Sequence, residues 1–231
     1  MRPEERIGLR AFLDAYPGMR VCPSPAGVIR LEGDFGFRAD HENGPVIEDS
    51  YRLQIEVPHR FPDELLTTFE LGSRIPRDPD HHVLSDGSLC LGSPFRLLLI
   101  AREARTLTAF ARQGIVPYLY AASYRERTGG PYPFGELAHG AEGLLDDYAQ
   151  LFGLTTHRQA LAALALLATK RRLANKKPCP CGCAQRLGVC RFNETIRSLR
   201  GEFGRTRFKR LYGQVLSNWP SSGFPAEDHP S

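Results

Sequence analysis

Two stretches of alternating sequence, residues 28–37 (VIRLEGDFGF) and 51–57 (YRLQIEV), decide the fold class. Apolar residues recur at every second position in both, which places them on one face of a β-strand and their polar neighbours on the other. Gly44-Pro45 separates the two stretches, and residues 65–71 (LLTTFEL) have the composition of a further strand. Strands joined by short turns predict an antiparallel meander.

Helical periodicity precedes and follows these strands. Residues 4–16 (EERIGLRAFLDAY) predict a first helix that ends at Pro17-Gly18. The predicted fold class is therefore α+β, an antiparallel meander flanked by helices and followed by a helical extension with a small metal-binding module. The later predicted helices cover residues 95–113, 115–125 and 141–153, a stretch from Thr156 toward Pro178, and a last helix capped by Asn193.

Composition places the chain among folded proteins. Of its 231 residues, 42% are hydrophobic and 24% charged, which excludes a wholly disordered chain. The longest strongly apolar run, residues 161–168, is far shorter than the ~18 residues needed to cross a bilayer. The charged N-terminal sequence MRPEERIGLR lacks the apolar region of a signal peptide. We therefore expect a cytoplasmic protein without a membrane partner.

Charge is divided unevenly along the chain. Residues 170–210 contain 13 Lys and Arg but 2 Asp and Glu, whereas residues 1–169 contain 17 Arg, no Lys and 22 Asp and Glu. The net charge of +4 thus combines an acidic first part with a strongly basic later segment. Such a split predicts two parts with different tasks.

A Pro- and Gly-rich stretch, residues 75–94, contains the candidate nucleophile Cys90. A reversal of the chain at Asp86-Gly87 would bring His81 or His82 back beside the sulfur. There an imidazole can act as a base, donate to an oxyanion or stabilise a thiolate. The alternative is structural, because a cysteine between two leucines often serves as a small buried apolar residue.

The order of these features resembles the ubiquitin-conjugating-enzyme family over roughly residues 5–125. In that family a meander leads through a flap to a His-Pro-Asn motif and then to G-x-[IV]-C-L, which carries the thioester-forming cysteine. The matching stretch here is PDHHVLSDGSLCLG, with Cys90 at the position of that cysteine. His81-His82 occupies the place of the His-Pro-Asn motif, and the Asn is absent.

The resemblance implies that Cys90 accepts an acyl group as a thioester and passes it to a target amine. It implies that His82 or His81 orients the thioester or stabilises the oxyanion, and that Asp80 and Asp86 are candidates for deprotonating the amine. Asp86 also has the alternative role of shaping the turn. Variants with His near the Cys are similar to bacterial relatives in antiphage operons, including CBASS systems. The implied partners are the C-terminus of a ubiquitin-like protein or of a nucleotidyltransferase, and an activating enzyme.

A second group of chemical residues is a dense cysteine cluster, Cys179, Cys181, Cys183 and Cys190. Four thiolates in a Pro- and Gly-rich turn predict a closed, structural Zn²⁺ site. The string CPCGCAQRLGVCR also resembles the SEC-C zinc motif, with Arg191 in the place of its fourth ligand and Cys183 as the substitute. The alternatives are a metal-free thiol cluster, disulfides, or iron–sulfur ligation.

These observations predict a conjugating-like domain over residues 1–125, a helical extension over 126–177, a zinc knuckle with a basic helix over 178–213, and a flexible tail over 214–231. The basic segment, with its interleaved aromatic residues, suits nucleic acid, an acidic protein partner or solvent. Two rival functions therefore stay open. One is a non-catalytic conjugating-like binding scaffold, and the other is a zinc-knuckle nucleic-acid-binding protein.

Overall fold

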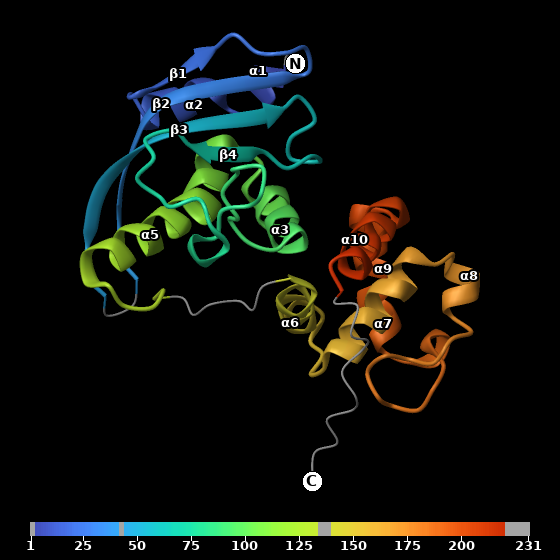
Figure 1. The fold of residues 1–231 in the computed structure, drawn as a ribbon. Coiled ribbons are helices and arrows are strands. Elements are labelled where there is room, and N and C mark those ends of the chain that lie inside the picture. Colours follow the sequence, from blue (N-terminus) through green and yellow to red (C-terminus); the bar gives the residue numbers. More distant parts are fainter. Residues whose placement is uncertain (1–2, 42–43, 134–139, 220–231) are drawn as a thin grey trace. The chain divides into compact units, whose positions relative to one another are not determined.

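The computed structural model describes residues 3–41, 44–133 and 140–219. The chain divides into two compact units, Met1–Glu136 and Leu137–Ser231 (Figure 1). The first unit contains a four-stranded antiparallel sheet with helices, and the second is helical within its described part. The predicted α+β class with an antiparallel meander is confirmed.

The sheet of the first unit is a simple meander. Each strand pairs antiparallel with the next one along the chain, as Figure 1 shows. The sequence does not predict the first strand, because its four residues are too few for alternation to stand out. The strands are β1 (Met19–Cys22), β2 (Val28–Ala39), β3 (Ile47–Pro58) and β4 (Thr67–Glu70).

The alternating residues of β2 and β3 face one core. Leu31 pairs with Ile55 in the register of these strands, and both side chains are buried. Gly33 allows the close approach of β1, because a Cβ added there would lie 2.0 Å from the carbonyl oxygen of Gly18. The buried face therefore fixes the register of β2 with β3, and Gly33 fixes the close pairing of β2 with β1.

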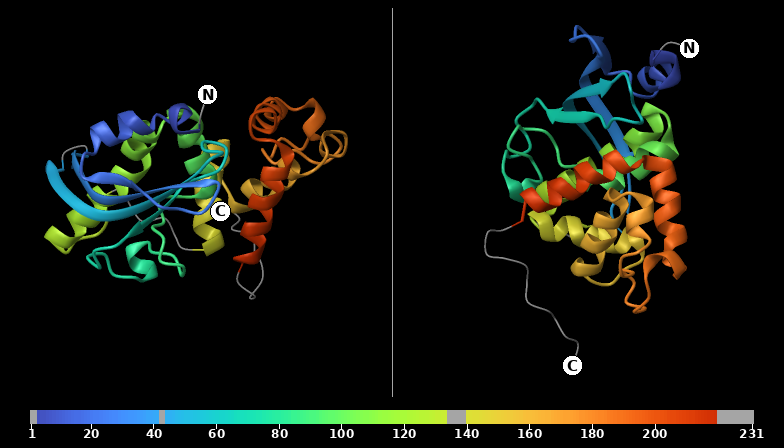
Figure 2. Two further views of the ribbon diagram at one scale, coloured as in Figure 1. Left: turned by 90° about the horizontal axis from the view of Figure 1, so that it is seen from above. Right: turned by 90° about the vertical axis from the view of Figure 1, so that its right-hand side faces the viewer.

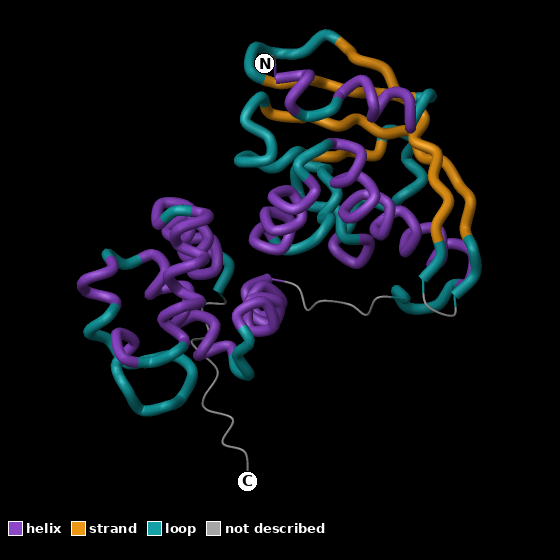
Figure 3. The backbone as a smooth tube through the Cα atoms, turned by 180° about the vertical axis from the view of Figure 1, so that it is seen from behind, coloured by secondary structure: helices purple, strands orange, loops and turns teal. Residues whose placement is uncertain are grey.

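Helices from both ends of the first unit pack on the buried face of the sheet (Figure 3). Tyr16 stacks on Phe35 of β2 with ring centroids 4.2 Å apart. Gly8, with φ at 68°, breaks the helix predicted over residues 4–16 into two. These helices are α1 (Pro3–Arg6), α2 (Leu9–Ala15), α3 (Pro94–Ala104), α4 (Leu107–Phe110) and α5 (Val116–Thr128).

One π-helical turn, Ala111–Ile115, joins α4 to α5. Pro117 stands two residues after this turn; its nitrogen cannot donate a backbone hydrogen bond, and its ring clashes with the preceding helical turn. The wider turn accommodates that proline without ending the helix. The boundary predicted after residue 125 falls inside α5, which continues to Thr128.

The second unit contains the helices of the predicted extension and of the predicted basic module. Helix α7 ends at Ala168, well before Pro178, because Thr169 takes an extended backbone conformation. Gly204 divides the predicted last helix in two, and Arg191 rather than Asn193 precedes its first residue. The helices are α6 (Gly140–Phe152), α7 (His157–Ala168), α8 (Arg171–Ala174), α9 (Phe192–Phe203) and α10 (Arg205–Ser217).

The end of α10 corrects the prediction of a tail over residues 214–231. The helix runs to Ser217, so the first four residues of that range are helical. Its apolar side anchors it, since Leu211 and Val215 are buried. Residues 220–231 lie outside the part of the chain that the structure describes.

In the described part of the chain, no single helix combines the length and apolar character needed to cross a membrane. Helices α6 and α7 reach that length and composition only as a pair, and they are bent by 75° at the break between them. The two helices pack on each other, and each also packs on α10 (Figure 2). Leu145 and Leu164, on their apolar sides, are fully buried.

Arg74 ties the segment that follows β4 to the sheet and to α5. Its guanidinium donates two hydrogen bonds of 2.8 Å to the carboxylate of Asp49 and further bonds of 2.9 and 2.5 Å to Glu126. The group also lies 4.3 Å from the ring centroid of Tyr51. The Ser123 hydroxyl donates to Asp49 at 2.9 Å. The bond from Arg74 holds the pKa of Asp49 well below its usual range.

We predict that Arg74→Met lowers the free energy of unfolding of the first unit by about 2 kcal/mol, because charge-assisted hydrogen bonds to Asp49 are lost. Hydrogen exchange of peptides from β3 measures this change. Arg38→Met is the control, since Arg38 and Glu48 form a pair of 3.7 Å with side chains 72% and 77% exposed. Equal costs for the two variants would refute the role of the network.

The same network predicts a dependence of stability on pH. The pKa of Asp49 is lower in the folded chain than in the unfolded chain, so its contribution is present above the unfolded value of about 3.9. It is lost as pH falls below that value. Protection of β3 in the native chain should therefore decline as pH falls from about 4 toward about 2, more steeply than in Asp49→Asn.

Candidate thiol site and cysteine cluster

Cys90 follows a tight reversal of the backbone. The amide of Gly87, which has φ at 84°, donates to the Leu84 carbonyl at 2.8 Å, and the Leu84 amide donates to the Ser88 carbonyl at 2.8 Å. The chain returns so that the Cys90 amide donates to the His82 carbonyl at 2.7 Å. The reversal expected at Asp86-Gly87 is therefore present, and it joins His82 to Cys90 through the main chain.

The two histidine side chains have separate neighbours. The Nδ1 atom of His81 lies 2.7 Å from a carboxylate oxygen of Asp78. The His82 ring packs against Tyr132 with centroids 5.2 Å apart, and His82 itself has a left-handed backbone with φ at 53°. The structure thus places both residues at the turn, with their imidazoles held by Asp78 and Tyr132.

The two aspartates of the site differ in what they contact. The Asp86 carboxylate accepts from the Ser88 amide at 2.9 Å and from the Ser88 hydroxyl at 2.6 Å, which lowers the pKa of Asp86. This pattern is that of a turn-forming aspartate. Asp80 contributes its carbonyl oxygen, which accepts from Arg125 at 2.6 Å and from the Tyr132 hydroxyl at 3.3 Å.

Helix α5 and the residues after it supply groups that sequence reasoning missed. The Tyr118 hydroxyl donates to the His81 carbonyl at 2.7 Å. The Arg125 guanidinium, besides its bond to Asp80, lies 4.9 Å from the centroid of the Tyr132 ring. Their only signal in the sequence is the concentration of tyrosine in residues 118–132. Together these side chains clamp the turn that carries Cys90.

Burial controls protonation at this site. Cys90 is half-buried, and burial raises the pKa of its thiol, while the amide of Gly92 lowers it in part. Burial also raises the pKa of Tyr118, with smaller contributions from the nearby groups Tyr132 and Cys90. At neutral pH the site therefore holds a protonated thiol beside a protonated tyrosine. Attack by the sulfur requires that its proton be removed.

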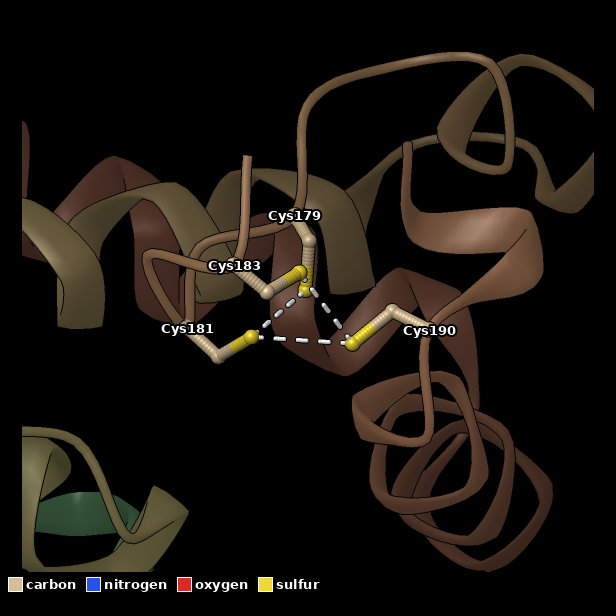
Figure 4. Close-up of side chains that lie close together, drawn as sticks. All are labelled: Cys179, Cys181, Cys183 and Cys190. Atoms are coloured by element: carbon tan, nitrogen blue, oxygen red, sulfur yellow. Dashed lines mark hydrogen bonds between the residues drawn. The ribbon is translucent and has the colours of Figure 1, made fainter. Parts of the chain in front are cut away.

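The four cysteines of the second unit lie in one cluster, at the loop between α8 and α9 (Figure 4). The sulfur atom of Cys181 lies 3.2 Å from that of Cys179 and 3.6 Å from that of Cys190, and Cys183 lies 3.5 Å from Cys190. All four sulfurs are within 4.8 Å of one another. A tetrahedron with zinc–sulfur bonds of about 2.3 Å has edges of about 3.8 Å, so the cluster fits a metal ion.

Backbone hydrogen bonds shape this loop independently of any metal ion. The Cys179 amide donates to the Gln185 carbonyl at 2.8 Å, closing a small hairpin. Gly182 turns within it at a φ of 83°. The Phe192 amide, at the start of α9, donates to the Cys190 sulfur at 3.4 Å. A hydrogen bond from the Cys179 thiol lowers the pKa of Cys181 to about 7, which favours a thiolate, the form that binds metal.

We predict that Tyr118→Phe loosens the turn at Cys90, because the His81 carbonyl loses its donor. The alkylation of Cys90 by iodoacetamide should then become several-fold faster, with a midpoint of its pH profile closer to the free-thiol value of about 8.5. Peptide mass spectrometry follows the reaction. Tyr124→Phe, on the same helix, is the control and should leave rate and midpoint unchanged. A Tyr118→Phe profile identical to that of the unaltered protein would contradict the clamp.

Comparisons of the chain with protein-family models, with curated proteins and with solved structures gave no match. The residues that bear on function are therefore those of two clusters, Cys90 with its clamp in the first unit and the four cysteines in the second.

Proposed function

We propose that the first unit is a ubiquitin-conjugating-like acyl carrier whose reactive group is the Cys90 thiol. The observation that carries the proposal is the position of Cys90. It follows an antiparallel meander and a fixed turn, and it stands three residues before Ser93, the N-cap of α3. A sulfur in that position, half-buried but held by main-chain bonds, suits a group that receives and passes on an acyl chain.

The proposed reaction has two steps. The sulfur of Cys90 attacks the carbonyl carbon of an activated C-terminal carboxylate, so that a carbon–sulfur bond forms and the bond to the activating group breaks. The thiol proton leaves with that group or with a base. A target amine then attacks the thioester, the carbon–sulfur bond breaks, an amide forms, and a proton returns to the sulfur. The proposed donor is the C-terminus of a ubiquitin-like protein or of a nucleotidyltransferase.

The raised pKa of Cys90 suits a carrier. A thiol of high pKa is a poorer leaving group, so its thioester is exchanged more slowly by stray nucleophiles. Transfer then depends on a partner that supplies an oriented amine. His82 is the proposed donor to the tetrahedral oxyanion, since its carbonyl accepts a hydrogen bond from the Cys90 amide and its ring packs against Tyr132. His81 is proposed to hold the turn through Asp78.

The burial of Cys90 also favours a second candidate, a non-catalytic binding scaffold. Leu89 is buried on one side of Cys90, and Leu91 packs against the same core on the other. In that case the sulfur fills space between them and no acyl adduct ever forms. The two functions differ in whether Cys90 is acylated.

Cys90 acylation is tested on protein purified from its native host without reductant. We expect an added mass on Cys90 that both dithiothreitol and neutral hydroxylamine release, because thioesters react with both. A mass released by dithiothreitol alone would identify a disulfide and contradict acyl transfer. In Cys90→Ser the adduct should become an oxyester that dithiothreitol and neutral hydroxylamine leave intact and that hydroxide cleaves. Cys22→Ser is the control and should keep the adduct, whereas absence of any adduct on Cys90 would favour the scaffold.

We also propose that Cys179, Cys181, Cys183 and Cys190 hold a structural Zn²⁺. Four sulfur ligands leave no position for water, so such an ion stabilises a loop and takes no part in a reaction. The hairpin and the amide of Phe192 already orient the ligands. In the bound state the thiols lose their protons.

We expect about one zinc per chain after native purification, measured by plasma mass spectrometry. Cys181→Ser should lower this ratio strongly and reduce the melting temperature of the second unit, while Cys22→Ser should change neither. Chelation should expose residues 178–190 to hydrogen exchange and leave β2 and β3 protected. A ratio near zero, or iron with visible absorption, would refute the zinc assignment.

A further inference from the structure

Three arginines gather at the C-terminal end of α7. The Nη2 atom of Arg200 on α9 donates to the Leu166 carbonyl at 2.5 Å, and the Nη1 atom of Arg205 on α10 donates to the Ala168 carbonyl at 3.5 Å. Arg171 is the first residue of α8, which begins just after α7 ends. Residues from three helices thus bring three arginines to the C-terminal end of α7.

The two exposed arginines of this cluster are not balanced by ion pairs to acidic residues in the described part of the chain. Arg171 and Arg205 are exposed, and neither forms an ion pair with any residue that the structure describes. The Nε atom of Arg200 is buried, and it has no hydrogen-bond partner among the residues that the structure describes. Burial, and then the charges of Arg171 and Arg205, lower the pKa of Arg200. A neighbouring anion would offset this repulsion.

The hydrogen bonds to the α7 carbonyls use only part of the donor capacity of the arginine side chains. Each guanidinium has five N–H donors, and one donor each from Arg200 and Arg205 goes to α7. A planar fork of donors matches two oxygens of a phosphate group. The remaining donors of the cluster therefore suit phosphate.

Further groups continue from the cluster along α10. Arg205, Lys209 and Tyr212 follow one another at helical spacings of four and three residues, so they lie on one side of the helix. Lys209 is exposed, and the Tyr212 ring is half-exposed. A row of cations that ends in an aromatic ring suits a chain of phosphates with bases to stack, rather than a carboxylate-rich peptide.

We infer that Arg171, Arg200 and Arg205 form a phosphate-binding site for the backbone of a nucleic acid, extended along α10 by Lys209 and Tyr212. The phosphates bind the guanidinium groups, and a base stacks on Tyr212. This site lies in the second unit and needs neither Cys90 nor an acyl donor, so it stands or fails apart from the proposed transfer reaction.

The test uses the full-length protein as purified and a fluorescein-labelled single-stranded RNA of about 20 nucleotides, longer than one typical binding site. Anisotropy is measured from about 50 to 200 mM salt. We expect Arg171→Gln/Arg205→Gln to weaken binding at least about tenfold and to reduce the slope of log Kd against log salt by about 1.4, the value for two lost contacts to a single strand. Cys90→Ala should bind as the unaltered protein does.

The matched control is Arg20→Gln/Arg52→Gln, which removes two exposed charges from the first unit. It should leave affinity and slope nearly unchanged. An equal loss in both double variants would overturn the site, because binding would then follow net charge alone. Failure of the unaltered protein to bind RNA at the lowest salt would also overturn it, as would tighter binding of a polyglutamate peptide than of RNA.

A second measurement needs no variant. Phenylglyoxal modifies accessible guanidinium groups, and mass spectrometry locates the modified residues. The RNA should protect Arg171 and Arg205 of the unaltered protein and leave Arg20 and Arg52 reactive. Equal protection of all four residues, or none at Arg171 and Arg205, would contradict the assignment.

Discussion

The position of Cys90 depends on one face of helix α5. The segment between β4 and α3 contains a short 3-10 turn, isolated bridges and main-chain hydrogen bonds across its reversal, and side chains of α5 add donors to it. Tyr118 and Arg125 stand seven residues apart, two helical turns, and therefore share a side of α5. They donate to the consecutive carbonyls of His81 and Asp80. The turn that carries Cys90 is thus held by a core helix as well as by its own main-chain bonds.

The strands could be predicted because one face of the sheet is buried. Alternation over residues 28–37 and 51–57 reports that burial directly. The interruptions of the helices could not be predicted in the same way. Periodicity indicates which residues face a core, and it continues through Gly8 and Gly204, where positive φ angles end the helical backbone. A glycine permits such a break but does not require it.

The two candidate sites differ in how far they could be predicted from the sequence. The four cysteines lie within twelve positions, so a local hairpin is enough to bring them together. At Cys90 the reversal was also local, and it joins His82 to Cys90 as expected. The directions of the imidazoles are set by Asp78 and Tyr132, and the second of these lies 50 residues beyond His82. Only the packing of α5 on the sheet brings such distant groups to the turn.

The distribution of lysine bears on the lifetime of the proposed thioester. Arg outnumbers Lys by 26 to 4 in the whole chain, and the first unit contains no lysine. A guanidinium stays protonated in proteins and cannot act as the attacking amine, whereas a lysine can lose its proton and attack. An acyl group on Cys90 would therefore meet no lysine side chain of its own unit. A genome rich in G and C accounts for the same composition without selection, but its chemical consequence for a thioester is identical: an attacking lysine must come from outside the unit that carries it.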